Sequence, residues 1–194
     1  MSTVTQEKDY GHVPVLLHEC LDALAIKPDG IYVDGTLGRA GHSLEIVKRL
    51  TTGRLIGIDR DETAIAAAQE RLAEYGDRVT LVHSNFDRIG DILADLHIDG
   101  ADGMLFDLGV SSPQLDDAER GFSYMHDAPL DMRMDRTAYL TAREVVNSWS
   151  YEELRRILFE YGEERYAPAI AKRIGILKEE SEACEGAVIE NMSD

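Results

Sequence analysis

The sequence predicts an α/β fold in which helices cover both faces of a parallel sheet. Three observations support this fold: four short apolar runs end in polar residues, helical patterns separate these runs, and turn residues bound each run. Strands that alternate with helices form parallel sheets, because each crossover helix returns the chain to the same end of the sheet. Right-handed crossovers then give an open, doubly wound half-sheet with the strand order 3-2-1-4.

The four expected strands are short and apolar, and they span residues 30–34, 54–59, 78–83 and 103–107. A first helix should begin at Pro14 and stop before the turn at residues 27–30. Ser43 and Asp61 can cap the helices that follow the first and second strands. Apolar residues at helical spacing over residues 89–96 indicate a third crossover helix.

The second half of the chain has a different character. Residues 108–135 have no long apolar period, which predicts an ordered functional loop. Capping boxes at residues 141–144 and 150–153 open two short helices, and a further helix is expected over residues 163–177. We therefore expect three parts, which are a cofactor-binding core (1–110), a substrate loop with part of a helical insert (111–177) and a disordered acidic tail (178–194).

Composition narrows the function class. The 194 residues carry 37 acidic and 20 basic side chains, a net charge of −17. This charge argues against a general nucleic-acid coating protein but leaves room for an enzyme with a local basic patch. No apolar run is long enough to span a bilayer, no secretory signal opens the chain, and the six histidines have no metal-ligand spacing. We expect a cytoplasmic protein without a metal ion.

A glycine-bearing loop follows the first strand. Gly35, Gly38 and Gly41 come directly after Asp34, and glycines let the backbone pass close to a ligand. The second strand ends in Asp59, whose carboxylate can accept both hydroxyls of a ribose. The glycine spacing differs from the dinucleotide fingerprint and from the P-loop. Together the loop and Asp59 favour a nucleotide-type cofactor.

Two further strand ends point to the same crevice, because ligands of open α/β sheets bind outside the carboxyl ends of the strands. Phe86 follows the third strand and could cover one face of an adenine, although a core position is an equal interpretation. Asp107 and the small polar residues Ser111 and Ser112 follow the fourth strand, where they suit an amino or ammonium group, while Pro113 stiffens the loop.

Three long segments are highly distinctive: DLGVSSPQLD at 107–116, ERGFSY at 119–124 and PLDMRMD at 129–135. With them, the sequence closely resembles the small-subunit ribosomal RNA cytosine-N4 methyltransferases of the RsmH/MraW type. The resemblance runs from about His12 to about Arg173. It implies a Rossmann-like fold, S-adenosylmethionine as cofactor and methylation of a cytosine N4 in the decoding region of 16S rRNA, with the small ribosomal subunit as partner.

The resemblance also implies a set of cofactor contacts. By position these are Ala40, Gly41, His42, Asp59, Phe86, Asp107 and Gln114. Ala40 stands where many relatives have Gly. Asp107 is the candidate catalytic residue, facing either the methionine ammonium or the target amine.

On the substrate side, Phe122 or Tyr124 could stack an extruded base. The basic residues of this region could meet phosphates or pair with neighbouring acids, and they are Arg120, Arg133 and Arg136.

Family members are longer than this chain, so we expect a truncated C-terminus and an open edge at the fourth strand. Two alternatives to an active methyltransferase therefore stay open. The first is a non-catalytic fragment that binds an adenosyl ligand. The second is a nicotinamide-dependent dehydrogenase, which the acidic charge and Asp59 favour and the glycine spacing disfavours.

Overall fold

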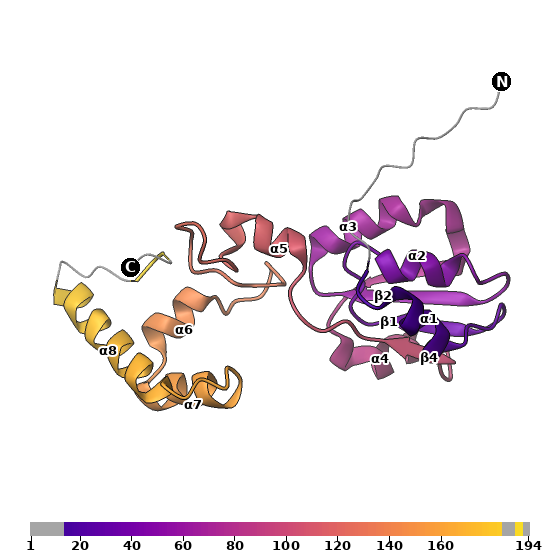
Figure 1. Cartoon of the computed structure of the whole chain (residues 1–194). Helices are drawn as coiled ribbons and strands as arrows, with labels where there is room; N and C mark the ends of the chain where they lie inside the picture. Colours follow the sequence, from indigo (N-terminus) through magenta and orange to yellow (C-terminus); the bar gives the residue numbers. More distant parts are fainter. Residues whose placement is uncertain (1–13, 184–188, 192–194) are drawn as a thin grey trace, which may run out of the picture. The chain divides into compact units, whose positions relative to one another are not determined.

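The chain divides into two compact units, Met1–Gly109 and Val110–Asp194. The computed structural model describes residues 14–183 and 189–191. The first ten residues, where no secretory signal is expected, lie outside the described part, as do residues 184–188 and 192–194 of the tail. The first unit contains a sheet with helices around it, and the second contains helices and turns (Figure 1).

Four parallel strands of the first unit form one sheet, which confirms the predicted class and the strand order 3-2-1-4. The strands are β1 (Ile31–Asp34), β2 (Arg54–Asp59), β3 (Val79–His83) and β4 (Gly103–Leu105). In β2 the residues from Leu55 to Ile58 are all buried, as expected for a central strand covered on both faces. The register places Asp34 of β1 beside Gly57 and Leu105.

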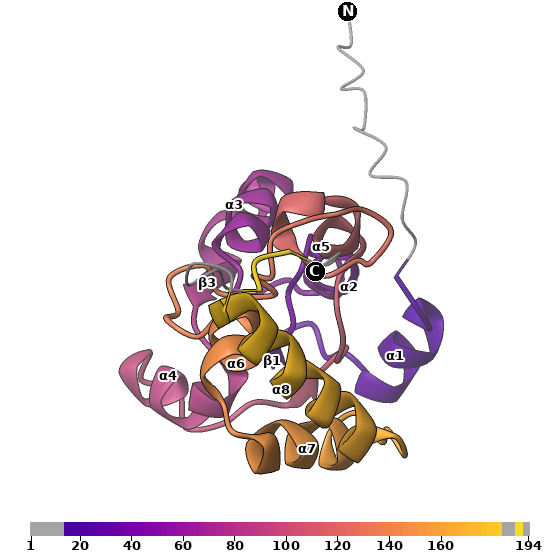
Figure 2. The same cartoon turned by 90° about the vertical axis from the view of Figure 1, so that its left-hand side faces the viewer.

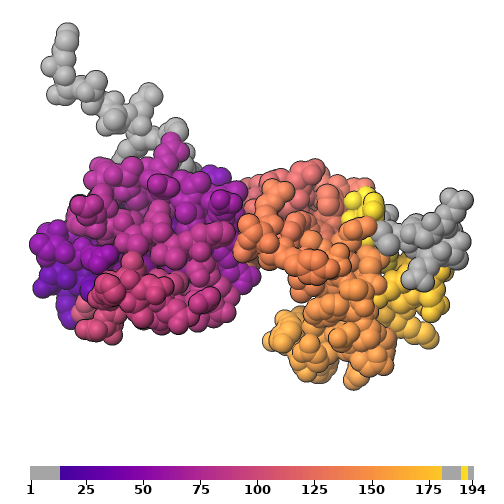
Figure 3. All heavy atoms as spheres, turned by 180° about the vertical axis from the view of Figure 1, so that it is seen from behind, coloured from indigo at the N-terminus to yellow at the C-terminus, as the bar shows by residue number. Residues whose placement is uncertain are grey.

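Helices cover both faces of this sheet. They are α1 (Leu17–Leu24), α2 (Gly41–Val47), α3 (Glu62–Arg71) and α4 (Ile89–Asp95), with 3-10 turns η1 (Ala73–Arg78) and η2 (Phe86–Arg88). α2 and α3 lie on one face and α4 lies on the other (Figure 1). Two apolar clusters match this division, one around Ile46 and Leu55 and one around Val33, Ile56 and Ile92. The space-filling view shows the unit as a rounded mass (Figure 3).

Local chemistry explains where α3 begins but not where α2 begins. The buried Asp61 side chain accepts a hydrogen bond from the Thr63 amide, so the predicted cap of α3 is confirmed. The predicted cap at Ser43 is wrong, because α2 already begins at Gly41. The Ser43 hydroxyl instead donates to the Asp34 carboxylate at 2.7 Å. This contact depends on the fold and has no signal in the local sequence.

The fourth strand and the first helix are shorter than predicted. β4 ends at Leu105, so residues 106 and 107 lie in the loop that follows. α1 begins at Leu17, and Pro14 precedes it. In both cases the apolar run in the sequence extends beyond the backbone hydrogen bonds of the element, so the run alone overestimates the element's length.

The second unit contains the remaining helices. They are α5 (Ser112–Asp116), η3 (Ala118–Arg120), α6 (Ala142–Ser148), α7 (Tyr151–Glu160) and α8 (Ala167–Ala183). Ser150 and Glu153 form the predicted capping box of α7. α7 packs against α8 (Figures 1 and 2), where Leu154, Ala167 and Ala171 are buried. The small alanine side chains allow the two helices to approach closely.

The expectation of a disordered tail from residue 178 is wrong for the described part. α8 continues to Ala183. Farther along, the Ile189 amide donates to the Asn147 side chain at 3.1 Å, and the Leu130 amide donates to the Glu190 carbonyl at 2.9 Å. These partners are distant in sequence, so periodicity within the tail could not reveal them.

Among the described residues, no helix is both long enough and apolar enough to cross a membrane.

Candidate functional site

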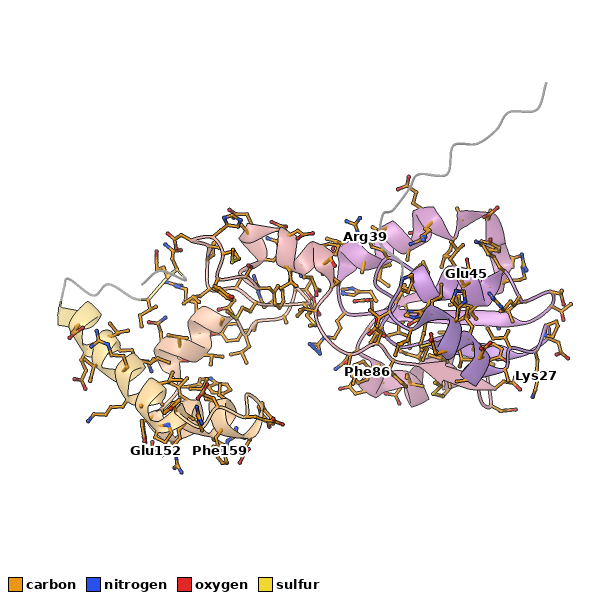
Figure 4. The ribbon with its side chains drawn as sticks, viewed as in Figure 1. Lys27, Arg39, Glu45, Phe86, Glu152 and Phe159 are labelled. Carbon is orange, nitrogen blue, oxygen red and sulfur yellow. The ribbon has the colours of Figure 1, made fainter. Side chains whose placement is uncertain are left out.

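The carboxyl ends of the four parallel strands meet at one edge of the first unit. The loops that leave these ends carry six of the predicted contact residues, and they are Ala40, Gly41, His42, Asp59, Phe86 and Asp107. Figure 4 labels Phe86 and Arg39 at this end of the sheet and Lys27 at the opposite end. The strand topology thus brings residues from four separate loops to one edge.

Asp34 ends β1 and is almost fully buried, at 2% exposure. One carboxylate oxygen accepts the Ser43 hydroxyl at 2.7 Å, and the other accepts the Thr36 amide at 3.2 Å. Burial raises the pKa of this carboxyl, and the two hydrogen bonds oppose that shift. The side chain therefore ties α2 to the glycine-bearing loop and has no exposed face for a ligand.

Asp59 ends β2 and is only partly buried. Its two oxygens accept the Gly38 amide at 2.7 Å and the Asp61 amide at 2.8 Å. Because each amide uses one lone pair of one oxygen, both oxygens keep a second acceptor site. Two backbone donors thus fix the carboxylate in an orientation from which it can accept a pair of hydroxyl groups.

The three glycines of the loop lie in three different surroundings, and each surrounding explains the glycine in its own way. A side chain at Gly35 would meet the Phe106 ring at 2.4 Å, and one at Gly41 would meet Pro14 at 2.5 Å. Only Gly38 faces open space, with its backbone at φ +51°, in the left-handed region. At Gly35 and Gly41 the absence of a side chain thus makes room for other parts of this chain, and contact of this loop with a ligand stays a prediction.

Ala40 and His42 contribute differently from one another. Ala40 is fully buried and holds the left-handed conformation (φ 59°) at the start of α2. The buried His42 ring contacts the Val15 carbonyl through Nε2 at 3.1 Å, which links α2 to the segment before α1. The His42 ring is thus engaged within the unit, and a contact of its backbone with the cofactor stays a prediction.

Phe86 lies in an aromatic contact at the same edge. Its ring and that of Phe106 meet edge to face, with centroids 5.5 Å apart. The preceding residue, Asn85, has a buried side-chain oxygen without a hydrogen-bond partner among the described residues. A buried acceptor of this kind is costly until it meets a donor. The strand-three end thus combines an aromatic ring with an unsatisfied acceptor.

Asp107 lies in the loop after β4 and is exposed. Its backbone amide donates to the Thr36 hydroxyl at 2.6 Å. Its carboxylate has no hydrogen bond or ion pair among the described residues, so the group is available to accept a hydrogen bond from a bound molecule.

Gln114 is the one predicted contact that belongs to the second unit. Its side-chain oxygen accepts the Ser111 amide at 3.0 Å, and the two residues form the capping box of α5. The residue is buried. Its contact with the cofactor therefore stays a prediction.

Two of the three predicted phosphate contacts are engaged inside the second unit. The buried Arg120 guanidinium donates to the Arg133 and Met134 carbonyls. Arg133 forms an ion pair with Asp131 at 2.6 Å, which lowers the pKa of the Asp131 carboxyl. Pairing with a neighbouring acid, the alternative interpretation, is thus confirmed for Arg133, and Arg136 alone of the three is exposed.

Sequence reasoning missed Thr36, Phe106 and Asn85. Thr36 lies in the loop after the first strand, where the sequence pattern points to the glycines. Phe106 falls inside the predicted strand 103–107 and so is not expected in a loop. The one sequence feature that points to Asn85 is its position directly before Phe86, a predicted contact. Within the described ranges, no group of three or more potential metal-ligating side chains could hold an ion.

A parallel sheet of this order, with a glycine-bearing loop after β1 and a fixed carboxylate at the end of β2, is typical of a Rossmann-like α/β core. A model of the MraW methylase family matches residues 9–190. The chain belongs to this family. The match also corrects the expectation that the resemblance fades after Arg173.

A curated relative and two solved structures are similar to the chain. The ribosomal RNA small subunit methyltransferase H of Symbiobacterium thermophilum is 56% identical over 166 residues, covering 85% of this chain and 52% of the relative. The chain thus spans about half the length of that relative.

The structural likenesses are loose. A putative rRNA-methylase from Clostridium thermocellum gives a TM-score of 0.42 at 24% identity, covering 51% of this chain and 54% of that chain. A SAM-dependent methyltransferase from Aquifex aeolicus gives 0.37 at 17% identity, covering 75% and 78%. Neither likeness carries an argument by itself.

Proposed function

We propose that this chain supplies the cofactor-binding part of a methyltransferase that uses S-adenosylmethionine. The proposed substrate is the N4 amine of a cytidine in the decoding region of 16S rRNA, with the small ribosomal subunit as the partner. Membership of the MraW methylase family supports the reaction class. The observation that carries the proposal for this chain is the Asp59 carboxylate, held by the Gly38 and Asp61 amides at the end of β2.

The residues at this edge fit an adenosyl cofactor. Asp59 would accept the two ribose hydroxyls, and Phe86 would cover one face of the adenine. The unsatisfied Asn85 oxygen is an acceptor beside Phe86, which suits the exocyclic amine of adenine. Ala40 to His42 would present backbone near the methionine carboxylate. When bound, the cofactor supplies an electrophilic methyl group on a sulfonium sulfur.

The chain's own contribution to the chemistry is placement of the target amine. The lone pair of a cytosine amine is delocalised into the ring, which makes the nitrogen a poor nucleophile. Positioning, together with an acceptor for an amine hydrogen, can lower the barrier. The unengaged Asp107 carboxylate is the acceptor that this edge offers. The Asp107 carboxylate would take up the one proton that the amine loses on methylation, and the thioether S-adenosylhomocysteine would be the other product.

Transfer of a labelled methyl group from S-adenosylmethionine to undermethylated 30S subunits tests the proposed function. We expect the full chain to label 16S rRNA at one cytidine N4. Asp107→Asn should lower turnover by about 100-fold, because general-base and hydrogen-bond contributions are of that order. Asp99→Asn, which changes an exposed carboxylate in the loop before β4, is the matched control. Unchanged turnover of Asp107→Asn would remove Asp107 from the chemistry.

The same assay separates the alternatives. A chain that binds S-adenosylhomocysteine but transfers no methyl group would be the non-catalytic fragment, an outcome of interest because the chain spans about half the relative. The match to the MraW methylase family gives no support to the nicotinamide-dependent dehydrogenase.

A further inference from the structure

The segment that carries Asp107 is held from one side only. β4 is an edge strand that pairs with β1, and no other described strand lies along its second side. The pairing ends at Leu105, where the Gly35 amide donates to the Leu105 carbonyl at 2.9 Å. Beyond Leu105, the Phe86 ring contacts Phe106 from η2, and the loop after β1 supplies the next hydrogen bond.

One side chain supplies the hydrogen bond that follows the end of the ladder. The Thr36 hydroxyl accepts the Asp107 amide at 2.6 Å. Between these two hydrogen bonds, the Phe106 ring lies against the bare Cα of Gly35. Thr36 thus continues the connection between the two loops for two residues beyond the strand, with a side-chain oxygen in the place of a backbone carbonyl.

Thr36 is itself fixed from the interior. Its amide donates to Asp34 at 3.2 Å, and the other oxygen of Asp34 accepts the Ser43 hydroxyl of α2 at 2.7 Å. Because Asp34 is buried, water competes little for these bonds. A continuous series of hydrogen bonds therefore runs from α2 through Asp34 and Thr36 to Asp107.

We propose that Thr36 is the positioning residue for Asp107: its hydroxyl fixes the backbone from which the Asp107 carboxylate reaches the reacting amine. This inference rests on the proposed function for the role of Asp107, but the hydrogen bond itself does not. In this role Thr36 acts through the backbone of Asp107. Valine has the shape of threonine without the acceptor, whereas serine keeps the acceptor.

The variants Thr36→Val and Thr36→Ser of the full chain test this role, with Thr51→Val as the matched control. Thr51 also uses its hydroxyl for a hydrogen bond, to the Pro28 carbonyl near the opposite end of the sheet. In Thr36→Val we expect the Asp107 amide to exchange its hydrogen roughly 10-fold faster, as for a lost net hydrogen bond. The amides of β2 should be unaffected, and Thr36→Ser should match the wild type.

Methyl-transfer kinetics supply the second measurement. Thr36→Val should lower kcat by about 10-fold and leave the KM for S-adenosylmethionine within about twofold, because misplacement affects the reacting geometry more than binding. Thr36→Ser should restore kcat. The proposal is overturned if Thr36→Val leaves the exchange at Asp107 and kcat unchanged, or if Thr36→Ser is as impaired as Thr36→Val. If the wild-type chain transfers no methyl group, the proposed function fails, whereas the exchange rates still decide whether Thr36 holds Asp107.

Discussion

Asp34 is the residue at which burial and electrostatics conflict most directly. The carboxyl lies in the interior, where ionisation is disfavoured, yet two donors point at it. Burial is the larger effect and raises the pKa above its ordinary value of 3.8. The folded protein therefore binds this proton more tightly than the unfolded chain does.

A raised pKa in the folded state fixes the sign of a pH dependence. The stabilisation is fully present below the unfolded pKa of 3.8, and it is lost as the pH rises through the folded pKa. Asp34→Asn removes this titration. We expect the free energy of unfolding of the wild type to fall relative to Asp34→Asn as the pH rises from about 4 toward neutrality, measured by urea denaturation at several pH values. A difference that stays constant with pH would contradict the assignment.

Two opposing contributions to stability meet at Ala40: the strain of its left-handed backbone and the burial of its methyl group. A left-handed conformation costs a residue other than glycine roughly 1 kcal/mol or more, whereas the buried methyl group contributes about 0.8 kcal/mol. Ala40 has φ 59° and no exposed surface. Ala40→Gly should therefore leave stability unchanged or raise it by up to about 1 kcal/mol, measured by urea denaturation. A loss greater than about 1 kcal/mol would show that packing of the methyl group dominates.

Strand ends could be predicted from the sequence, and side-chain partners could not. Asp59 and Phe86 are predicted because a polar or aromatic residue lies at or shortly after the end of an apolar run, and the sheet brings such ends to one edge. Thr36 and Ser43 take their roles from Asp107 and Asp34, which become neighbours only after the strands pair. Gln114 was assigned to the cofactor by resemblance, and the structure shows its side chain engaged in the cap of α5.

At the scale of elements, α7 owes its start to a reciprocal cap. The Ser150 hydroxyl accepts the Glu153 amide, and the Glu153 carboxylate accepts the Ser150 amide at 2.8 Å. The Ser150 hydrogen bonds lower the pKa of the Glu153 carboxyl. Such a box is visible in the sequence because it is local, and the same is true of the Asp61 cap.

Removal of the α7 cap should have a measurable cost. Ser150→Ala should destabilise the protein by about 1 kcal/mol, and Ser150→Asp should recover most of that loss because aspartate also caps well. The helical circular dichroism signal during thermal unfolding reports both effects. Equal stability of Ser150→Ala and the wild type would mean that packing against α8 alone determines where α7 begins.

At the scale of the whole molecule, the exposed edge of the sheet is the main liability. Within residues 14–183 and 189–191 the one partner strand of β4 is β1, and Met104 and Phe106 are more than one-third exposed at this edge. Unpaired strand edges with apolar side chains promote association between copies. We expect the chain to self-associate as its concentration rises, as observed by analytical ultracentrifugation.

A charge on that edge should reduce the association. Met104→Lys places a lysine on an exposed position of β4, which is a common way to protect edges. Val15→Lys, at an exposed apolar residue before α1, is the matched control and should have no effect. If both variants associate as strongly as the wild type, another surface is responsible.

Titration calorimetry with S-adenosylhomocysteine tests the central claim most directly, namely that the carboxyl edge of the sheet binds an adenosyl ligand through Asp59. We predict saturable binding to the wild-type chain, at least about 10-fold weaker binding to Asp59→Ala because hydrogen bonds to a carboxylate are lost, unchanged binding to Asp99→Asn, and no comparable binding of NAD. Equal affinity of Asp59→Ala and the wild type, or the absence of binding by the wild type, would contradict the account.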